Sequence, residues 1–154
     1  MPPDISVRAA RPGDHERIVA VADEWWGRPV AAKLPRLFLD HFAATSLVAE
    51  RDGALAAFLI GFHSPSAADT AYVHFAAVRP DERGNGIAAE LYERFTAAAA
   101  AAGRTVVRAV TSPGNARSIA FHSALGFSVS APVPDYDGPG RDRVVFERRT
   151  GPAR

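Results

Sequence analysis

The most constraining feature of this sequence is an apolar segment that runs through a glycine-containing turn into a helical pattern. Residues 73–78 are apolar except for one histidine, and a proline then ends the segment. Gly84 and Gly86 follow, and a helical pattern begins at Ile87. The first backbone N–H groups of a helix lack intrahelical partners, and together with the helix dipole they bind anions. Arg83, directly before the first glycine, adds a positive charge, so we expect an anion site suited to phosphate groups at this turn.

Composition and charge limit the class of protein. A chain of 154 residues with 47% hydrophobic and 23% charged residues is expected to form one soluble globular domain, residues 1–154. A net charge of +1 argues against binding nucleic acid through a broad basic surface. Zero cysteines exclude disulfides and thiolate metal sites. Residues 1–8 lack the apolar region of a secretory signal and no window approaches 18 apolar residues, so we expect a cytoplasmic protein without a membrane partner.

Hydrophobic periodicity and turn residues predict alternating strands and helices. Asp14 is expected to cap the first helix, Pro35 to start a fresh helix within the second helical region, and Asp52-Gly53 to form a hairpin turn. Hairpins mixed with β-α-β crossovers indicate an α/β fold, a mixed sheet of about seven strands with four helices on both faces. The expected strands are 5–8, 46–50, 54–62, 70–78, 105–110, 127–133 and 143–148, and the expected helices are 15–26, 31–44, 86–102 and 115–125.

The last predicted helix carries a second pattern of interest. At 100° per residue, Asn115, Ser118, Ile119 and His122 fall on one face. Three alanines lie on the opposite face, which we expect to pack against the core. An amide, a hydroxyl and an imidazole in a row favour a binding face, although a solvated face of no special function has the same pattern.

Two other phosphate-binding patterns do not fit this chain. The run Gly84-Asn85-Gly86-Ile87-Ala88-Ala89 matches the dinucleotide pattern G-x-G-x-x-A. That pattern belongs in the first β-α-β unit of its domain, with an acidic residue about 20 positions further on for the ribose. Here it lies in the middle of the chain, and the next predicted strand ends in Thr111-Ser112. The chain also lacks a Gly-Lys-Ser/Thr sequence, which excludes a nucleoside-triphosphate P-loop.

The turn and the last helix together resemble the GNAT superfamily of acyl-CoA N-acyltransferases. The pattern Val78-x-Pro80-x-x-Arg83-Gly84-x-Gly86-Ile87-Ala88 is similar to that family's pyrophosphate-binding sequence. About 30 residues later, Asn115-x-x-Ser118-x-x-Phe121-His122-x-x-Leu125-Gly126-Phe127 is similar to a second family pattern. The resemblance covers about residues 5–148 and implies a single GNAT-like domain with a splayed sheet.

The resemblance implies an acetyl-CoA site without a metal ion. Backbone groups of Ala76 and Val78 are expected to pair with the pantetheine arm, and the N–H of Ala77 or Val78 to polarise the thioester carbonyl. The residues implied in coenzyme binding are Ala76, Ala77, Val78, Arg83, Gly84, Asn85, Gly86, Ile87, Ala88, Asn115, Ser118 and His122.

The resemblance also implies two proton-transfer positions, and both depart from the residues usual in the family. The usual proton donor is a tyrosine directly after Phe121, where this chain has His122. His122 either donates to the leaving thiolate or only packs and hydrogen-bonds to the arm. Several relatives carry a glutamate where Tyr72 stands, so His74, on the same strand face, is the candidate base, with a hydrogen-bonded core histidine as the alternative. His63 is a weaker candidate, and deprotonation through water needs no residue.

The acceptor pocket implied by the resemblance is bounded by the loop after the first helix and the last hairpin. Its candidate residues are Trp26, Tyr72, His74 and Tyr136. Tryptophans beside a turn, and the aspartates that flank Tyr136, suit a cationic amine with an apolar part. The alternative is that the tryptophans are core anchors and the aspartates are turn formers.

The expected function is therefore N-acetyl transfer from acetyl-CoA to a primary amine of a small molecule or peptide, and the resemblance implies a homodimer. A catalytically weak acyl-CoA-binding sensor or partner module is the main alternative, since the glutamate and tyrosine usual in the family are missing. O-acyl transfer also stays open, and a nucleotide-binding oxidoreductase is the least favoured function.

Overall fold

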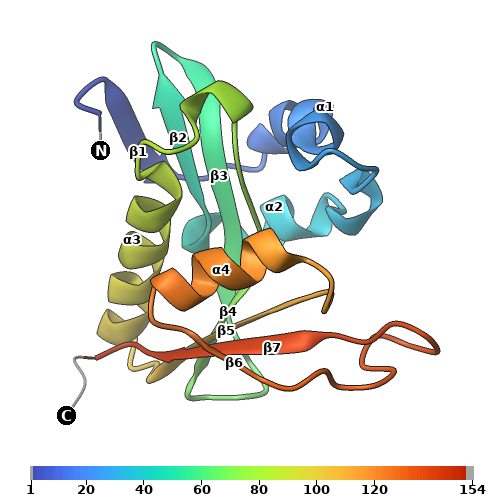
Figure 1. The fold of residues 1–154 in the computed structure, drawn as a ribbon. Helices are drawn as coiled ribbons and strands as arrows, with labels where there is room; N and C mark the ends of the chain where they lie inside the picture. Colours follow the sequence, from blue (N-terminus) through green and yellow to red (C-terminus); the bar gives the residue numbers. More distant parts are fainter. Residues whose placement is uncertain (1, 152–154) are drawn as a thin grey trace. The chain divides into compact units, whose positions relative to one another are not determined.

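The computed structural model describes residues 2–151 and contains, over that range, seven strands and four α-helices (Figure 1). The strands form a mixed sheet in the order β1-β2-β3-β4-β5-β7-β6, which confirms the expected fold class. Within the same residues, every helix is too short or too polar to cross a lipid bilayer. The strands are β1 (Ile5–Ala9), β2 (Leu47–Arg51), β3 (Ala54–His63), β4 (Thr70–Val78), β5 (Val106–Thr111), β6 (Ser128–Val129) and β7 (Val144–Arg149), and the helices are α1 (Asp14–Trp26), α2 (Leu37–Phe42), α3 (Ile87–Ala101) and α4 (Ala116–Ala124).

The described chain consists of two compact units, residues 2–62 with 73–98 and residues 63–72 with 99–151. Strand β4 contributes to both. Its first three residues pair in parallel with β5, from Thr70 opposite Val106 to Tyr72 opposite Arg108. The rest of β4 belongs to the first unit. The expectation of a single domain over residues 1–154 stays a prediction.

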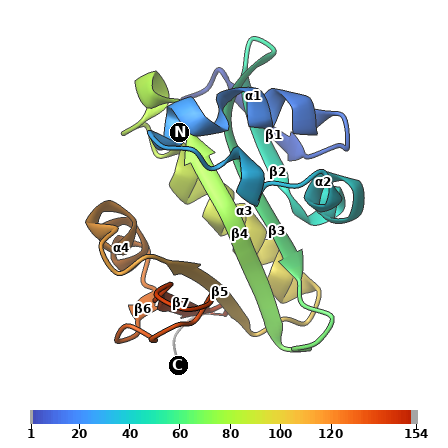
Figure 2. The same ribbon diagram turned by 90° about the vertical axis from the view of Figure 1, so that its right-hand side faces the viewer.

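In the first unit, helices cover both faces of the sheet, α3 on one face and α1 with α2 on the other (Figures 1 and 2). The burial of β3 reflects this, because every residue from Leu55 to Ile60 is buried, as expected for a strand covered on both sides. On the α1 face, Ile18, Trp25 and Phe58 belong to one apolar core. The periodic apolar positions of the first predicted helix therefore form this core.

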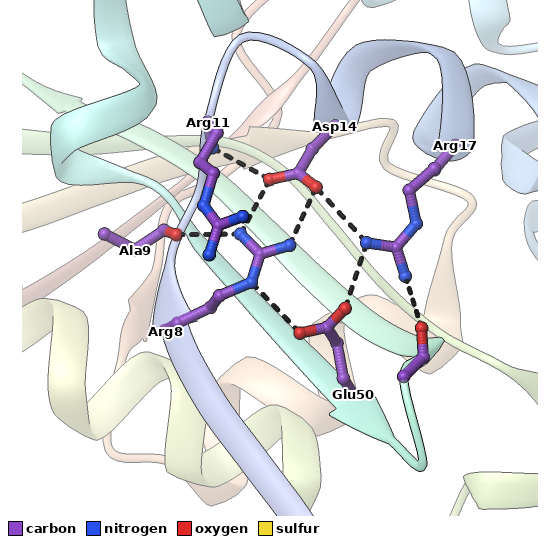
Figure 3. A network of polar contacts seen from close by, with 7 residues as sticks. Arg8, Ala9, Arg11, Asp14, Arg17 and Glu50 are labelled. Carbon is purple, nitrogen blue, oxygen red and sulfur yellow. Dashed lines mark hydrogen bonds and ion pairs between the residues drawn. The ribbon is translucent and has the colours of Figure 1, made fainter.

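A network of ion pairs attaches α1 to β1 and β2 (Figure 3). The carboxylate of Asp14, the first residue of α1, accepts two bonds of 2.9 Å from the Arg8 guanidinium. Arg8 also donates to Glu50 at 3.0 Å, and Arg17 donates to Asp14 at 3.3 Å and to Glu50 at 3.0 Å. The expected capping role of Asp14 is wrong, because these arginines and the backbone N–H of Arg11 take up its carboxylate and the cap position is a glycine.

The predicted helical region at residues 31–44 is three short helices. A 3₁₀ turn at Ala31–Lys33 precedes α2, and a second one at Ala43–Thr45 follows it. Leu34 has φ −121° and ψ 63°, outside the helical region, because a proline disfavours helical conformation at the residue before it. The chain turns helical again after Pro35, as predicted.

The predicted strand at residues 127–133 is much shorter in the structure. Strand β6 has two residues and is followed by an isolated bridge from Val133 to Arg143. Pro132 and Pro134 flank this bridge, and neither has an N–H to donate to a neighbouring strand. The other predicted strands and helices, apart from the region at 31–44, end within one residue of their predicted bounds.

Replacing Asp14 by asparagine is expected to destabilise the fold, because it leaves Arg8 and Arg17 with one carboxylate instead of two. Hydrogen bonds from Arg8 hold the pKa of the Asp14 and Glu50 carboxyls below their usual values. Both groups therefore stabilise the folded state above about pH 4 and lose this effect as the pH falls through the lowered pKa. Asp14→Asn should reduce the free energy of unfolding at neutral pH by about 2–4 kcal/mol and flatten its decline in acid.

Urea unfolding at a series of pH values measures both effects. Asp40→Asn is the control, because Asp40 pairs with the exposed Arg36 and its loss should cost no more than about 0.5 kcal/mol. Equal losses in the two variants would contradict a special role for the network.

Candidate functional site

The predicted anion-binding turn joins β4 to α3 in the first unit. Gly84 and Gly86 have φ values of 84° and 79°, which other residues rarely adopt. A Cβ atom at either position would meet no atom within 4 Å, so the backbone conformation rather than crowding requires glycine. The Glu90 N–H donates to the Gly86 carbonyl at 3.1 Å, and the N–H groups of residues 87–89 lie ahead of that bond. The turn therefore has the geometry of an anion cradle, residues 84–89.

Hydrogen bonds hold this turn at two places. The Arg79 N–H donates to the Ala56 carbonyl at 2.8 Å, which attaches the start of the turn to β3. Arg83 donates from its guanidinium to the carbonyl of Trp25, near the end of α1. An anion in the cradle would compete with this carbonyl for the Arg83 charge.

Strand β4 alternates in burial as predicted. Residues 71, 73, 75 and 77 are buried, and residues 72, 74, 76 and 78 are partly exposed. Ala76 and Val78 therefore share the more open side of the strand with His74, whereas Ala77 packs into the core.

His74 is held by a backbone carbonyl and an aromatic ring. Its Nε2 lies 2.6 Å from the Lys33 carbonyl oxygen, and its ring stacks on Phe38 with centroids 4.1 Å apart. Because a carbonyl only accepts, Nε2 carries the proton and Nδ1 has the lone pair in the neutral ring. Burial is the main cause that lowers the pKa of His74, so the ring is neutral at pH 7. The core-histidine interpretation and a role as base are both compatible with this geometry.

The two adjacent tryptophans of α1 have different surroundings. Trp25 is buried, with its ring centroid 6.1 Å from that of Phe58. Trp26 is half-buried against Phe75, at 4.4 Å between ring centroids. The core-anchor interpretation therefore holds for Trp25, and Trp26 keeps the exposed area that contact with a ligand needs.

In the second unit, Asn115 caps α4. Its Oδ1 accepts the Ser118 N–H at 3.2 Å, and its amide donates to the Thr111 hydroxyl at 3.1 Å. Both contacts stabilise the start of the helix, which gives Asn115 a local structural role.

Helix α4 turns its histidine face, not its alanine face, toward the core. The His122 ring is buried, stacks on Phe146 at 4.0 Å between centroids and meets Phe127 edge-on at 5.3 Å. The expectation that the alanines pack down is wrong, because this aromatic stacking buries more apolar area than three methyl groups could. The exposed alanines are Ala116, Ala120 and Ala124.

The hydrogen bonding of His122 fixes its tautomer. Its Nδ1 donates to the Ser118 carbonyl at 2.8 Å, so in the neutral ring Nε2 has the lone pair. Burial lowers the pKa of His122 and favours this neutral form. A neutral ring of this tautomer accepts a proton at Nε2 and does not donate one there.

Three other candidate side chains interact in the second unit. Burial, with smaller effects of Tyr136 and Asp137, raises the pKa of Tyr72 to about 12, so its hydroxyl is protonated at pH 7. Tyr136 is 47% exposed. Asp137 forms an ion pair of 2.8 Å with Arg143. Tyr72 thus offers a neutral hydroxyl near an exposed tyrosine.

The loop that carries Tyr136 is held by its own hydrogen bonds. Asp135 has φ 54°, and its carboxylate accepts the Gly140 N–H at 2.7 Å. Its N–H donates to the Asp142 carboxylate at 2.9 Å. The turn-former interpretation therefore holds for Asp135, and the loop presents Tyr136 at the surface.

The predicted site residues are divided between the two units. The first unit has Trp26, His74, residues 76–78 and residues 83–88, and the second has Tyr72, Asn115, Ser118, His122 and Tyr136. Over residues 2–151, no group of three or more His, Asp or Glu side chains is arranged to hold a metal ion. Sequence reasoning missed the backbone carbonyls that fix both histidines, because such contacts leave no residue pattern.

Comparison with protein families identifies one family. Residues 15–127 match the model described as the acetyltransferase (GNAT) family. This match includes the cradle and α4, and it spans well over half of the chain.

Two curated relatives match shorter stretches. An L-2,4-diaminobutyric acid acetyltransferase of Nocardia farcinica is 37% identical over 89 residues, 58% of this chain and 46% of that protein. An L-methionine sulfoximine/L-methionine sulfone acetyltransferase of Pseudomonas aeruginosa is 39% identical over 61 residues, 40% of this chain and 36% of that protein. The chain thus matches less than half the length of either relative.

A solved structure matches over nearly the whole chain. It is the diaminobutyrate acetyltransferase EctA of Paenibacillus lautus in complex with L-2,4-diaminobutyric acid and coenzyme A. The TM-score is 0.74 at 18% sequence identity, with 97% of this chain and 98% of that chain covered. At this identity the likeness establishes the fold.

Proposed function

The chain belongs to the acetyltransferase (GNAT) family, and on that premise we propose that it is an acetyl-CoA-dependent N-acetyltransferase. The observation that carries the proposal is the cradle, in which Gly84 and Gly86 have the positive φ values that open a helix start to a diphosphate. The proposed acceptor is the primary amine of a free amino acid or a molecule of similar size, with a peptide amine as the alternative.

The proposed coenzyme site uses backbone groups of the first unit. The N–H groups of residues 87–89 would hold the diphosphate, and Arg83 would leave the Trp25 carbonyl to pair with it. Backbone groups of residues 76–78 would bind the pantetheine arm and polarise the thioester carbonyl. Acetyl-CoA supplies the activated acetyl group.

We propose that His74 accepts the proton that the acceptor amine loses. An amine attacks only in its neutral form, so a base near neutrality helps the reaction. The lowered pKa of His74 and the lone pair on Nδ1 support this role, since the ring is neutral and Nε2 is occupied with the Lys33 carbonyl.

For His122, the geometry supports a packing and positioning role over proton donation. A donor at Nε2 must first gain a proton, and burial against Phe146 and Phe127 opposes the cation. We propose that Asn115 and Ser118 position this ring by setting the first turn of α4, whose Ser118 carbonyl accepts the His122 N–H.

The acceptor class is inferred from the names of the curated relatives, which give amino acids or their analogues, molecules with both an amine and a carboxylate, as the substrates of those enzymes. We propose that Trp26, Tyr72 and Tyr136 contact such an acceptor. Exposed aromatic area at Trp26 and Tyr136 and a protonated hydroxyl at Tyr72 support this. A cytoplasmic location, where acetyl-CoA is made and used, and a homodimer complete the proposal. Cell fractionation and light scattering test these two points.

The proposed activity is tested by release of free coenzyme A from acetyl-CoA with a panel of amines. We expect release with amino acids such as L-2,4-diaminobutyrate or methionine sulfoximine, and a mass increase of one acetyl group on the acceptor. Tight binding of acetyl-CoA without turnover on amino acids, amines or peptides would point instead to an acyl-CoA sensor. Failure to bind coenzyme A would refute the proposal.

His74 is tested through the pH dependence of kcat/KM. Above the lowered pKa of His74 the plot of log kcat/KM against pH should have a slope of about one, from the acceptor ammonium, and below that pKa the slope should rise to about two as His74 also binds a proton. His74→Gln keeps a donor for the Lys33 carbonyl but cannot act as a base, so the slope should fall to about one and the rate by about a hundredfold. His41→Ala, an exposed histidine of α2, is the control and should behave like the parent. An unchanged slope in His74→Gln would remove His74 from proton transfer.

His122 is tested by His122→Phe, which keeps an aromatic ring to stack on Phe146. If packing is its role, kcat should stay within about threefold of the parent, because only one hydrogen bond to the Ser118 carbonyl is lost. A drop in kcat of more than about tenfold with an unchanged Kd for coenzyme A would contradict a packing role and point to a direct part in the reaction, such as proton donation.

A further inference from the structure

We infer that Arg51 is a positioning residue for the coenzyme's diphosphate and that it acts through Glu82, an inference that rests on the proposed coenzyme site. Glu82 is the last residue of the 3₁₀ turn Pro80–Glu82 and stands two positions before Gly84. Its side chain is 8% exposed. A buried carboxylate beside an anion site is unfavourable for folding, because it is costly to desolvate, and for binding, because it repels the anion.

Arg51 compensates this carboxylate. Its Nε donates to Glu82 Oε2 at 2.9 Å and its terminal nitrogen to Oε1 at 3.2 Å, a two-pronged contact that uses both oxygens. Hydrogen bonding to Glu82 is the main cause that raises the pKa of Arg51. A weaker contact joins Arg51 to the exposed Asp4 at 3.2 Å. The pair therefore places no net charge next to the cradle.

Arg51 is held by strand pairing on both sides. It is the last residue of β2 and lies opposite Ile5 of β1 and Ala54 of β3. The Asp52-Gly53 hairpin turn follows it directly. Together with the bond from Arg79 to Ala56, the ion pair attaches both ends of the 3₁₀ turn to the β2–β3 hairpin. The backbone that enters the cradle is thus fixed before any ligand arrives.

Charge separates this role from simple stabilisation. The Cα atoms of Glu82 and Gly84 are at most about 7 Å apart, so an uncompensated carboxylate would act on an anion in the cradle at short range. Removing Arg51 leaves that carboxylate behind, whereas removing the Glu82 charge leaves a cation. The two changes should therefore alter coenzyme affinity differently, although each breaks the same ion pair.

The test is the Kd for coenzyme A by isothermal titration calorimetry, with the Arg51→Ala, Glu82→Gln and double variants. Arg51→Ala should weaken binding at least about tenfold, and more at low than at high salt. Glu82→Gln should stay within about twofold of the parent, and the double variant should recover to within about threefold. Arg94→Ala is the matched control. This substitution also removes one guanidinium, from an exposed ion pair with Glu90, at a position about 10 Å along α3 from the start of the helix. The Arg94→Ala variant should bind coenzyme A like the parent.

If Glu82→Gln or the double variant weakened coenzyme binding as much as Arg51→Ala does, the ion pair would only stabilise the fold. An unchanged Kd in Arg51→Ala would refute the inference, while the proposed coenzyme site would stand. No binding by the parent would refute the proposed function itself. Should Arg51→Ala not fold, Glu82→Gln is compared with the double variant. A further loss of more than about threefold on removing Arg51 from the Glu82→Gln background would contradict action through Glu82.

Discussion

The placement of α1 depends on the carboxylate of Asp14, and much of the first unit depends on α1. Arg8 of β1 donates two hydrogen bonds to this carboxylate, and Arg17 donates both to it and to Glu50 of β2. Near its other end, α1 offers the Trp25 carbonyl to Arg83. One buried acidic residue thus helps to set where the charge of the anion-binding turn points. Because the contacts are ionic, this arrangement weakens in acid rather than in heat alone.

Two histidines of the first unit act on consecutive carbonyls in the segment before Pro35. His15 contacts the Leu34 carbonyl at 2.9 Å and His74 the Lys33 carbonyl at 2.6 Å. The 3₁₀ turn ends at Lys33 and the proline keeps Leu34 out of the helical region, so the last two carbonyls of the segment accept from side chains. Each imidazole therefore uses one ring nitrogen for this contact, and only the other nitrogen can take part in further hydrogen bonding or proton transfer. His74 and His122 end as opposite tautomers, with basic atoms at Nδ1 and Nε2 respectively.

Local sequence patterns were sufficient for most elements of the fold, but not for the three short helices at residues 31–45 or the two-residue strand β6. Alternation located β4 to the residue, and the glycines, whose φ values other residues rarely adopt, located the cradle. The orientation of α4 was not predictable in this way, because it depends on Phe146, a strand residue 24 positions after His122. The Asp14 cap failed for the same reason, since Arg8 of β1 donates to its carboxylate from another element. Period and turn chemistry are properties of neighbours in sequence, whereas ion pairs and ring stacks join residues far apart in the chain.

Lys33, whose carbonyl holds His74, is the only lysine in the chain. Of the 18 lysines and arginines, the other 17 are arginines. Their guanidinium groups are not acylated at neutral pH. A protein proposed to acetylate amines therefore carries a single ε-amino group of its own, exposed in the segment before α2. Amine-directed reagents would attach to Lys33 or to the chain's α-amine. Lys33 therefore offers a position for a spectroscopic label close to the contact between its carbonyl and His74.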